Sequence, residues 1–243
     1  MKGKIWMDGS SLTPTLLAKT IDYAYLKANG TPGDIEQHCA EARQYDFAMV
    51  AINPAEVETC VKLLKGSPVR VGATIGFPLG QTTLAVKMYE IQDAIQRGAQ
   101  EMDMVINVRA VIGGNLDLTR REIGGLVKIC QPLGVTTKII LETYYLIDDQ
   151  KRAVCRIASE EGADFVKTTT GTGPGGATVE DVKLMRQEVG QAMGVKAAGG
   201  IRTLSSALAM LGAGANRLGT SSGVKIMQEF LAREKTTAPI IQN

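Results

Sequence analysis

The sequence predicts a (β/α)8 barrel, the TIM-barrel fold, as a single domain over residues 1–243. Short β-branched segments alternate with helical segments along almost the whole chain, which implies a parallel sheet with right-handed crossovers. Eight such units in 243 residues match the count and length of a closed barrel. An open doubly wound sheet usually carries a GxGxxG turn after its first strand, and no such turn follows residues 21–27.

The predicted elements follow one another with short connections. A short helix at about 12–19 precedes the first strand, Thr31-Pro-Gly-Asp is a helix start, and Pro54 suits a first helical turn. The predicted strands are 21–27, 47–53, 69–76, 101–107, 136–143, 165–171, 195–201 and 216–220. The helices that follow them are 31–45, 54–65, 82–97, 116–133, 148–161, 178–190, 203–211 and 222–232. We expect the tail 233–243 to be loosely held.

Composition excludes several function classes. The chain has 27 basic and 25 acidic residues, and the basic ones do not cluster with aromatic ones, so nucleic acid is not an expected partner. No apolar run approaches the ~20 residues of a membrane span, and the N-terminus lacks a signal-peptide core, which favours a cytoplasmic protein with no membrane partner. Cys39, Cys60, Cys130 and Cys155 are far apart with no CxxC, which indicates free thiols rather than disulfides or a metal site.

Two predicted strands each carry one lysine and run into glycine. Lys167 lies in FVKTTTG, and Lys196 lies 29 residues later in VKAAGGIR. An edge strand could carry such a lysine facing water. Both runs are too apolar on their flanks for that, so we expect two interior lysines.

Three further strands carry charges at positions compatible with the barrel interior. Asp103 lies in EMDMVIN, Lys138 and Glu142 share one face of TKIILET, and Asp22 lies at the start of the first strand. If their faces point inward, strands four to seven bring Asp103, Lys138, Lys167 and Lys196 into one small volume. An inert ion-pair network is the alternative, but buried charges are costly and favour a function.

A lysine that acts as a nucleophile must lose its proton. With the ordinary pKa of ~10.4, only about one lysine in 2,500 is a free amine at pH 7. A second ammonium about 5.5 Å away costs about 3 kcal/mol at an effective dielectric near 20, which lowers the pKa by roughly two units, and burial acts in the same direction. The free amine can then add to a carbonyl and form an imine, the electron sink for breaking an adjacent C–C bond. From the residues alone, neither lysine is favoured as the nucleophile.

Two glycine-rich loops follow the last two strands. Gly199-Gly200 ends the seventh strand, and GTSSG, with Ser221 and Ser222, ends the eighth and opens the last helix. Backbone N–H groups at a helix start form an anion site, and many barrels hold phosphate at these loops. A phosphorylated small molecule is therefore the expected partner. Residues 171–176 could close over the ligand or form a passive loop.

Six motifs together resemble the deoxyribose-phosphate aldolase family of class I aldolases, in order and spacing, over about 69–230: FVKTTTG, VKAAGGIR, GTSSG, EMDMVIN, TKIILET and GFPLG. The resemblance implies that Lys167 forms the Schiff base and that Lys196 lowers its pKa. It implies that Asp103 with Lys138 relays protons. The substrate-binding residues that we expect are Asp22, Thr170, Gly171, Gly199, Gly200, Ser221 and Ser222.

The reaction implied by this resemblance is that of a lyase, the reversible cleavage of 2-deoxy-D-ribose 5-phosphate to glyceraldehyde 3-phosphate and acetaldehyde. No metal and no organic cofactor is expected. Family members are often dimers or larger, so the resemblance implies that this chain could form a homo-oligomer, either a dimer or a tetramer.

The first third of the chain departs from the family pattern. Strand one of family members usually reads Asp-x-Thr, whereas this chain has Asp22-Tyr23-Ala24. Strand two commonly carries a cysteine where Ala51 stands. Loss of one hydroxyl can remove about 1 kcal/mol of binding, so the substrate could be another phosphorylated or unphosphorylated aldehyde.

Two other function classes remain at this point. A phosphosugar isomerase or synthase would need a carboxylate or neutral histidine as base, and the only histidine, His38, lies in a predicted helix where packing or exposure is the expected role. A non-catalytic barrel that binds a phosphometabolite is the other alternative.

Overall fold

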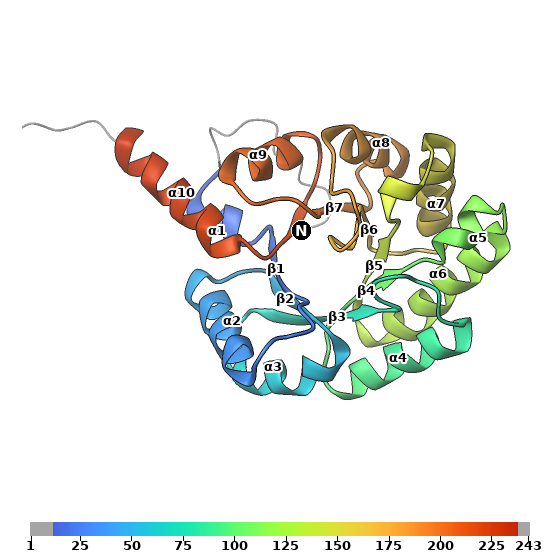
Figure 1. The fold of residues 1–243 in the computed structure, drawn as a ribbon, viewed down its shortest axis with the longest axis horizontal. Coiled ribbons are helices and arrows are strands. Elements are labelled where there is room, and N and C mark those ends of the chain that lie inside the picture. Colours follow the sequence, from blue (N-terminus) through green and yellow to red (C-terminus); the bar gives the residue numbers. More distant parts are fainter. Residues whose placement is uncertain (1–11, 238–243) are drawn as a thin grey trace, which may run out of the picture.

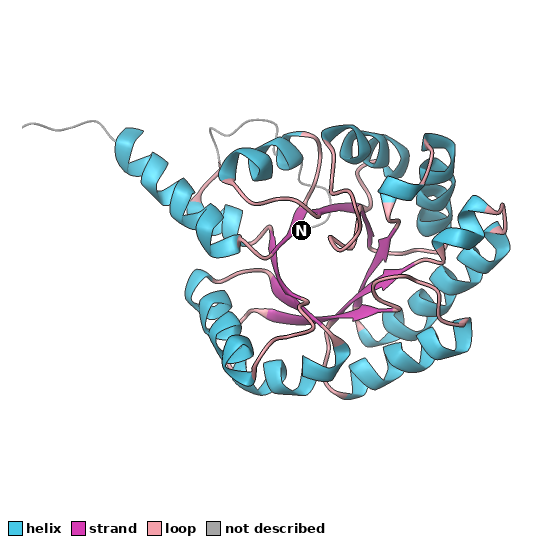
Figure 2. Cartoon of the chain, in the orientation of Figure 1, coloured by secondary structure: helices cyan, strands magenta, loops and turns pink. Residues whose placement is uncertain are grey.

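The computed structural model describes residues 12–237 and forms a closed barrel of eight parallel strands. Each strand pairs with its neighbour in the sequence, and β8 closes onto β1. The strands form the inner ring and the helices surround it (Figures 1 and 2). The predicted (β/α)8 barrel is confirmed.

The strands are β1 Ile21–Tyr25, β2 Met49–Ile52, β3 Arg70–Ile75, β4 Glu101–Val105, β5 Thr136–Ile140, β6 Phe165–Lys167, β7 Gly194–Ala198 and β8 Arg217–Thr220. The α-helices are α1 Pro14–Ala18, α2 Pro32–Tyr45, α3 Val57–Leu63, α4 Leu84–Gln96, α5 Val108–Ile112, α6 Leu116–Cys130, α7 Asp148–Glu160, α8 Val179–Val189, α9 Leu204–Gly212 and α10 Gly223–Thr237. Short 3-10 helices are η1 Pro54–Glu56, η2 Gln131–Leu133 and η3 Thr143–Tyr145.

Threonine side chains fix where several helices begin. The hydroxyl of the N-cap residue accepts a backbone N–H in α1, α2, α4, α8 and α9. Such a cap typically contributes about 1 kcal/mol to stability. At α2, the Asp34 carboxylate also accepts the Thr31 N–H at 2.7 Å, which completes a capping box at the helix start that the sequence predicted.

Glycines on the strands make room for large side chains inside the barrel. A Cβ on Gly194 would lie 2.1 Å from the Phe165 ring, and one on Gly219 would lie 3.0 Å from Lys196 Cε. Because neither approach is tolerated by packed atoms, the barrel interior alternates small and large residues. The space beside Lys196 is therefore fixed by the sequence of β8.

Strand β6 ends at Lys167, four residues before the predicted end. The Thr168 N–H still donates to the Lys196 carbonyl oxygen at 3.1 Å, and side chains take part in the contacts with β7 from this residue on. The Thr168 hydroxyl accepts the Ala198 N–H at 2.9 Å, and both Thr168 and Thr169 hydroxyls contact the Ala198 carbonyl oxygen. The run of three threonines therefore forms a pinned loop rather than a longer strand.

The prediction placed residues 101–107 in one strand, but Asn107 is the N-cap of a helix that was missed, α5. Its side-chain oxygen accepts the Ala110 N–H at 3.1 Å. An Asx cap of this kind competes with strand continuation, and this is the physical reason for the shorter strand.

The C-terminal prediction was partly wrong. Helix α10 continues to Thr237, so residues 233–237, which we expected in a loose tail, are helical. Residues 238–243 lie outside the described part of the chain. Within residues 12–237, no helix combines the length and apolar character needed to cross a bilayer. The four cysteines are free and buried.

A buried ion pair fastens the end of β4 to the outer helices. Lys87 of α4 and Glu122 of α6 are fully buried, with Nζ 2.7 Å from Oε1. Lys87 also donates to the Val105 carbonyl oxygen at 2.8 Å, and Glu122 accepts the Asn107 N–H at 2.9 Å. The Lys87–Glu122 pair thus hydrogen-bonds the Val105 carbonyl and the Asn107 N–H at the end of β4, the strand that carries Asp103.

We expect Lys87→Met to lower the free energy of unfolding by about 3–5 kcal/mol, because it leaves Glu122 charged and buried without its cation. Adding Glu122→Gln should recover part of that loss, since glutamine is uncharged and still accepts the Asn107 N–H. Urea unfolding of both variants measures this. A double variant no more stable than Lys87→Met would contradict the explanation.

Candidate active site

A cavity of about 480 Å³ lies at the carboxyl ends of the strands. Its wall includes the ends of β1, β6, β7 and β8 and one side of α2. Seven of the predicted site residues lie on this wall: Lys167, Thr170, Gly171, Lys196, Gly199, Gly200 and Ser221. The position agrees with the expectation that barrel chemistry gathers where strands end.

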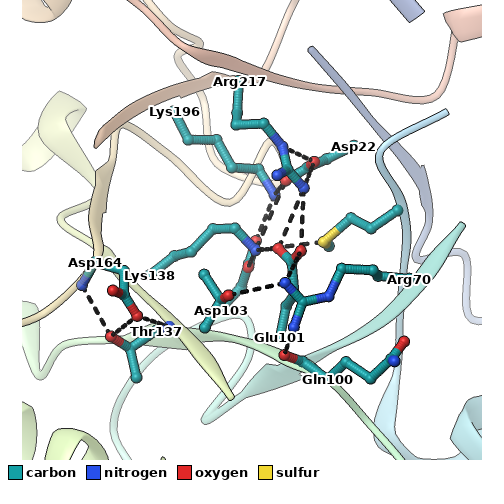
Figure 3. Close-up of polar contacts among 12 residues, drawn as sticks. Asp22, Arg70, Gln100, Glu101, Asp103, Thr137, Lys138, Asp164, Lys196 and Arg217 are labelled. Carbon is teal, nitrogen blue, oxygen red and sulfur yellow. Dashed lines mark hydrogen bonds and ion pairs between the residues drawn. The ribbon is translucent and has the colours of Figure 1, made fainter. Parts of the chain in front are cut away.

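Beneath this cavity, six charged side chains, five of them buried and one partly exposed, form a closed ring in which cations and carboxylates alternate; we call it the ion-pair ring. Four strands besides β4 contribute one member each, and β4 contributes two. Figure 3 shows these side chains converging from around the barrel. In order, the members are Arg217, Asp22, Lys196, Asp103, Lys138 and Glu101.

Each carboxylate of the ring bridges two cations. Asp22 Oδ1 lies 2.5 Å from Arg217 Nε and Asp22 Oδ2 lies 2.5 Å from Lys196 Nζ. Asp103 Oδ2 lies 2.6 Å from Lys196 Nζ, and its Oδ1 lies 2.9 Å from Lys138 Nζ. Glu101 contacts Lys138 and lies 3.2 Å from Arg217. Three positive charges therefore balance three negative charges.

Lys167 is a further cation beside the ion-pair ring, in addition to its three cations and three carboxylates. Its Nζ lies 2.8 Å from Asp103 Oδ2, the oxygen that Lys196 also contacts at 2.6 Å. The two amine nitrogens are therefore no farther apart than the sum of these two distances. Lys167 and Lys196 are also direct register partners across β6 and β7. The predicted meeting of the two lysines inside the barrel is confirmed.

The pKa of Lys167 is lowered to about 8. Burial is the largest cause, Asp103 acts against it, and the Lys196 and Lys138 ammonium groups lower the pKa further. From the sequence, a magnitude was given only for the neighbouring lysine, and burial was expected to act in the same direction; burial is the larger contribution. Burial and the two neighbouring ammonium groups thus outweigh the Asp103 counter-ion and raise the share of free amine near neutral pH.

Asp103 and Lys138 are both held in their charged forms. Burial alone would raise the pKa of Asp103, but Lys138, Lys167 and Lys196 bring it well below its ordinary value. Burial alone would lower the pKa of Lys138, but Asp103 and Glu101 raise it above its ordinary value. Asp103 and Lys138 therefore keep fixed charges in the surroundings of the Lys167 amine.

Asp22 and Ser222 are the two predicted substrate-binding residues that do not lie on the cavity wall. Asp22 is fully buried in the ion-pair ring between Lys196 and Arg217. Ser222 donates its backbone N–H to the Thr220 hydroxyl at 2.9 Å, directly before α10 begins. Contact of either residue with a substrate stays a prediction.

Glycines shape the opposite wall of the cavity. Gly171, Gly199 and Gly200 have φ values of 81°, 95° and 76°, a region that favours glycine. A Cβ on Gly199 would lie 2.4 Å from Thr169 Oγ1. The backbone of these loops can therefore approach an oxyanion closely, beside Ser221 at the start of α10.

The loop 171–176 is tied to this wall at both ends. The Ala177 N–H donates to the Gly199 carbonyl oxygen at 3.0 Å, and the Thr170 N–H donates to Glu142 Oε2 at 3.1 Å. Glu142 itself has φ 55° and is buried, just beyond the end of β5. The sequence analysis placed Glu142 in a strand and missed this anchoring contact.

The wall formed by β1 and α2 is aromatic and polar. His38 stacks on Tyr23 with ring centroids 4.0 Å apart, and its Nε2 lies 3.1 Å from the Tyr23 carbonyl oxygen. Burial lowers the pKa of His38 to about 4, so the ring is neutral at pH 7. The predicted packing role is confirmed, although the residue also lines the cavity. Ala24 and Ala51, the two departures from the family pattern, line it as well.

Sequence reasoning missed two members of the ion-pair ring, Arg217 and Glu101. A signal for Glu101 was present, because period two places it on the same strand face as Asp103. A charged residue at the start of β8, on the face of Gly219, was the corresponding signal for Arg217.

Comparisons with known proteins agree with this geometry. The sequence model of the DeoC/LacD family aldolases matches residues 17–229. A deoxyribose-phosphate aldolase of Bacteroides thetaiotaomicron is 59% identical over 226 residues, which cover 93% of this chain and 95% of the relative. A deoxyribose-phosphate aldolase of Thermococcus gammatolerans is 51% identical, with coverage of 87% and 95%.

Solved structures show the same likeness. A putative deoxyribose-phosphate aldolase from Coccidioides immitis superposes with a TM-score of 0.87 at 37% identity, covering 90% of this chain and 87% of that one. The tetrameric deoxyribose phosphate aldolase from Aeropyrum pernix gives a TM-score of 0.85 at 33% identity, with coverage of 91% and 93%.

Fold, cavity and similarity together define an aldolase built on a (β/α)8 barrel, that is, an enzyme of the lyase class. More particularly, the chain belongs to the DeoC/LacD family of aldolases.

We expect kcat/KM for aldol cleavage to rise with pH, to reach half its maximum near pH 8 and to level off above that, because the Lys167 ammonium loses its proton at the lowered pKa of about 8. At pH 7 about one enzyme molecule in ten then carries the free amine, compared with about one in 2,500 for an ordinary lysine. A pH profile of kcat/KM measures this. A limb near the ordinary lysine value would contradict the assignment.

Proposed function

We propose that the protein is a class I aldolase that reversibly cleaves 2-deoxy-D-ribose 5-phosphate to glyceraldehyde 3-phosphate and acetaldehyde, with Lys167 as the residue that forms the imine. The observation that carries this proposal is the position of Lys167, 3% exposed, on the cavity wall with a pKa of about 8. Phosphate contacts are assigned to the glycine wall and Ser221, across the cavity from α2.

The chemistry begins with attack of the Lys167 amine on C1 of the open-chain sugar. The carbinolamine loses water to give a protonated imine, which accepts electrons from the bond between C2 and C3. As that bond breaks, the C3 hydroxyl loses its proton and C3 becomes the aldehyde of glyceraldehyde 3-phosphate. The enamine left on Lys167 takes a proton at C2, and water then releases acetaldehyde.

The proton transfers in these reaction steps need groups that lie close to Lys167. Asp103 contacts Lys167 Nζ, and Lys196 reaches the cavity wall while bonded to Asp103. We assign proton exchange with the carbinolamine and enamine to this pair, directly or through a water. Lys138 has a raised pKa, so its role is to keep Asp103 ionised rather than to release protons.

A second candidate is an aldolase of this mechanism with a different aldehyde substrate. Ala24 and Ala51 both line the cavity, and neither offers a hydroxyl or a thiol to the carbon chain of a sugar. The imine chemistry is common to both candidates, and the terminal phosphate distinguishes them. A cytoplasmic location and a homo-oligomeric state remain predictions beside this proposal.

Borohydride reduction with limiting acetaldehyde should add one two-carbon unit to the protein, at Lys167, because reduction traps the imine. Lys167→Met, which keeps the apolar stem, should show no such adduct. Lys225→Ala serves as the control, since Lys225 is 60% exposed on α10. Peptide mass spectrometry locates the label. A label on Lys196 instead would reverse the roles of the two lysines, and no label at all would refute the imine mechanism.

Ser221→Asp should lower kcat/KM for 2-deoxyribose 5-phosphate at least about 100-fold, because a carboxylate at this wall repels phosphate. Activity on unphosphorylated 2-deoxyribose should change less than about threefold. Ser205→Asp, an exposed position on α9, is the matched control. Equal losses for both sugars would contradict the phosphate assignment and favour the second candidate.

A further inference from the structure

We propose that Arg217 is a positioning residue for the imine chemistry: by closing the ion-pair ring on the side away from the substrate, it leaves Lys167 as the buried cation whose one carboxylate contact, Asp103, is shared with two ring lysines. The inference rests on the proposed function, since it explains how the imine-forming amine is kept free. Arg217 itself does not touch the substrate cavity.

The contacts of Arg217 place it between two carboxylates. Its Nε lies 2.5 Å from Asp22 Oδ1, and its terminal nitrogen contacts Asp22 and lies 3.2 Å from Glu101 Oε2. The guanidinium lies 6.0 Å from the centroid of the Phe165 ring, and the side chain is 15% exposed. A lysine cannot hold two carboxylates in this forked manner, because its ammonium is a single point charge.

Charge balance gives Arg217 its effect on Lys167. With Arg217 present, the carboxylates of Asp22, Glu101 and Asp103 are balanced inside the ring, and Lys167 is a surplus cation. Without Arg217, the same three carboxylates have only two ring lysines as partners. Protonated Lys167 then becomes the third cation that balances the cluster, and its amine is harder to free.

The other charged groups near Lys167 do not cancel this effect. On the cavity side, Lys27, Asp34, Glu41 and Arg202 lie on the wall, two positive and two negative, and His38 is neutral. Glu142 lies beyond β5 and accepts the Thr170 N–H. On the other side, Arg70 lies 3.5 Å from Glu101, but its side chain is 37% exposed and hence partly screened by solvent.

Arg217 lines a second, smaller cavity on the side of the ion-pair ring away from the substrate cavity. It has a volume of about 230 Å³ and lies at the amino ends of the strands, where Arg70, Glu101, Phe165 and Arg217 begin β3, β4, β6 and β8. Lys167 and Lys196 do not line it, and Arg217 does not line the upper cavity. The ring therefore lies between the two cavities, and Arg217 acts on Lys167 across the ring rather than from the substrate side.

The test compares Arg217→Gln with Arg217→Lys in the full-length protein. Both variants lose the forked guanidinium, but only the first loses the charge. We expect the acid limb of kcat/KM in Arg217→Gln to move up by about one pH unit, with a loss of about tenfold at pH 7 and near-normal activity above the limb. Arg217→Lys should keep the limb within about 0.3 unit. Lys19→Ala, on the wall of the lower cavity but paired with Asp46, is the control without a shift.

Glu101→Gln provides a second variant with the opposite sign. It removes a negative charge from the ring, so the limb should move to lower pH. If both arginine variants move the limb equally, or lose activity equally at every pH, Arg217 has a structural role only and the inference is wrong. The borohydride adduct at Lys167 is measured separately in the unaltered protein. If no adduct forms, the proposed function is wrong. If the adduct forms but the acid limb of Arg217→Gln does not move, only the proposed role of Arg217 is wrong.

Discussion

Electroneutrality in a buried barrel interior is the constraint on which this structure depends. Seven ionised groups meet between β1 and β8, six of them with side chains that are fully or nearly fully buried. Taking any one charge out of water costs several kcal/mol, so an unordered collection of this kind would not fold. The alternation of cations and carboxylates in the ion-pair ring offsets that cost, because each carboxylate contacts a cation on both sides. Lys167 is the cation added to this balanced set, and burial together with the Lys196 and Lys138 ammonium groups lowers its pKa there.

The barrel is what makes such an arrangement available. Asp22 and Arg217 are separated by almost the whole chain and meet only because β8 closes onto β1. On the other side, Asp103 and Lys138 are direct register partners on β4 and β5. An open sheet with the same strands would leave the ring unclosed and one carboxylate without its second cation. The glycine at position 219 adds a local condition, since a side chain there would meet the stem of Lys196. Closure, register and small residues thus act together on the same few side chains.

The sequence predicted this interior only in part. Lysines 167 and 196 were foreseen because a lysine flanked by apolar strand residues needs a reason to be there. Arg217 lies beside an asparagine and close to the preceding helix, so its strand looked partly polar and its charge unremarkable. Strand ends were also misjudged where side chains compete with the backbone: Thr168 takes the place of a ladder partner, and Asn107 caps α5. The alternation of strands and helices and the length of the chain can be read from the sequence. Whether a side chain takes the place of a backbone hydrogen-bond partner depends on which atoms become neighbours after folding.

The structure also distinguishes the two lysines that the residues alone left equivalent. Both contact the same oxygen of Asp103, yet Lys196 has a second carboxylate, Asp22, at 2.5 Å, whereas Lys167 has none. Lys196 thus contacts two carboxylates, whereas Lys167 contacts one that it shares. Both side chains reach the cavity, so access does not distinguish them. The lowered pKa of Lys167, caused mainly by burial, and its single shared carboxylate are the grounds on which we propose Lys167 as the nucleophile.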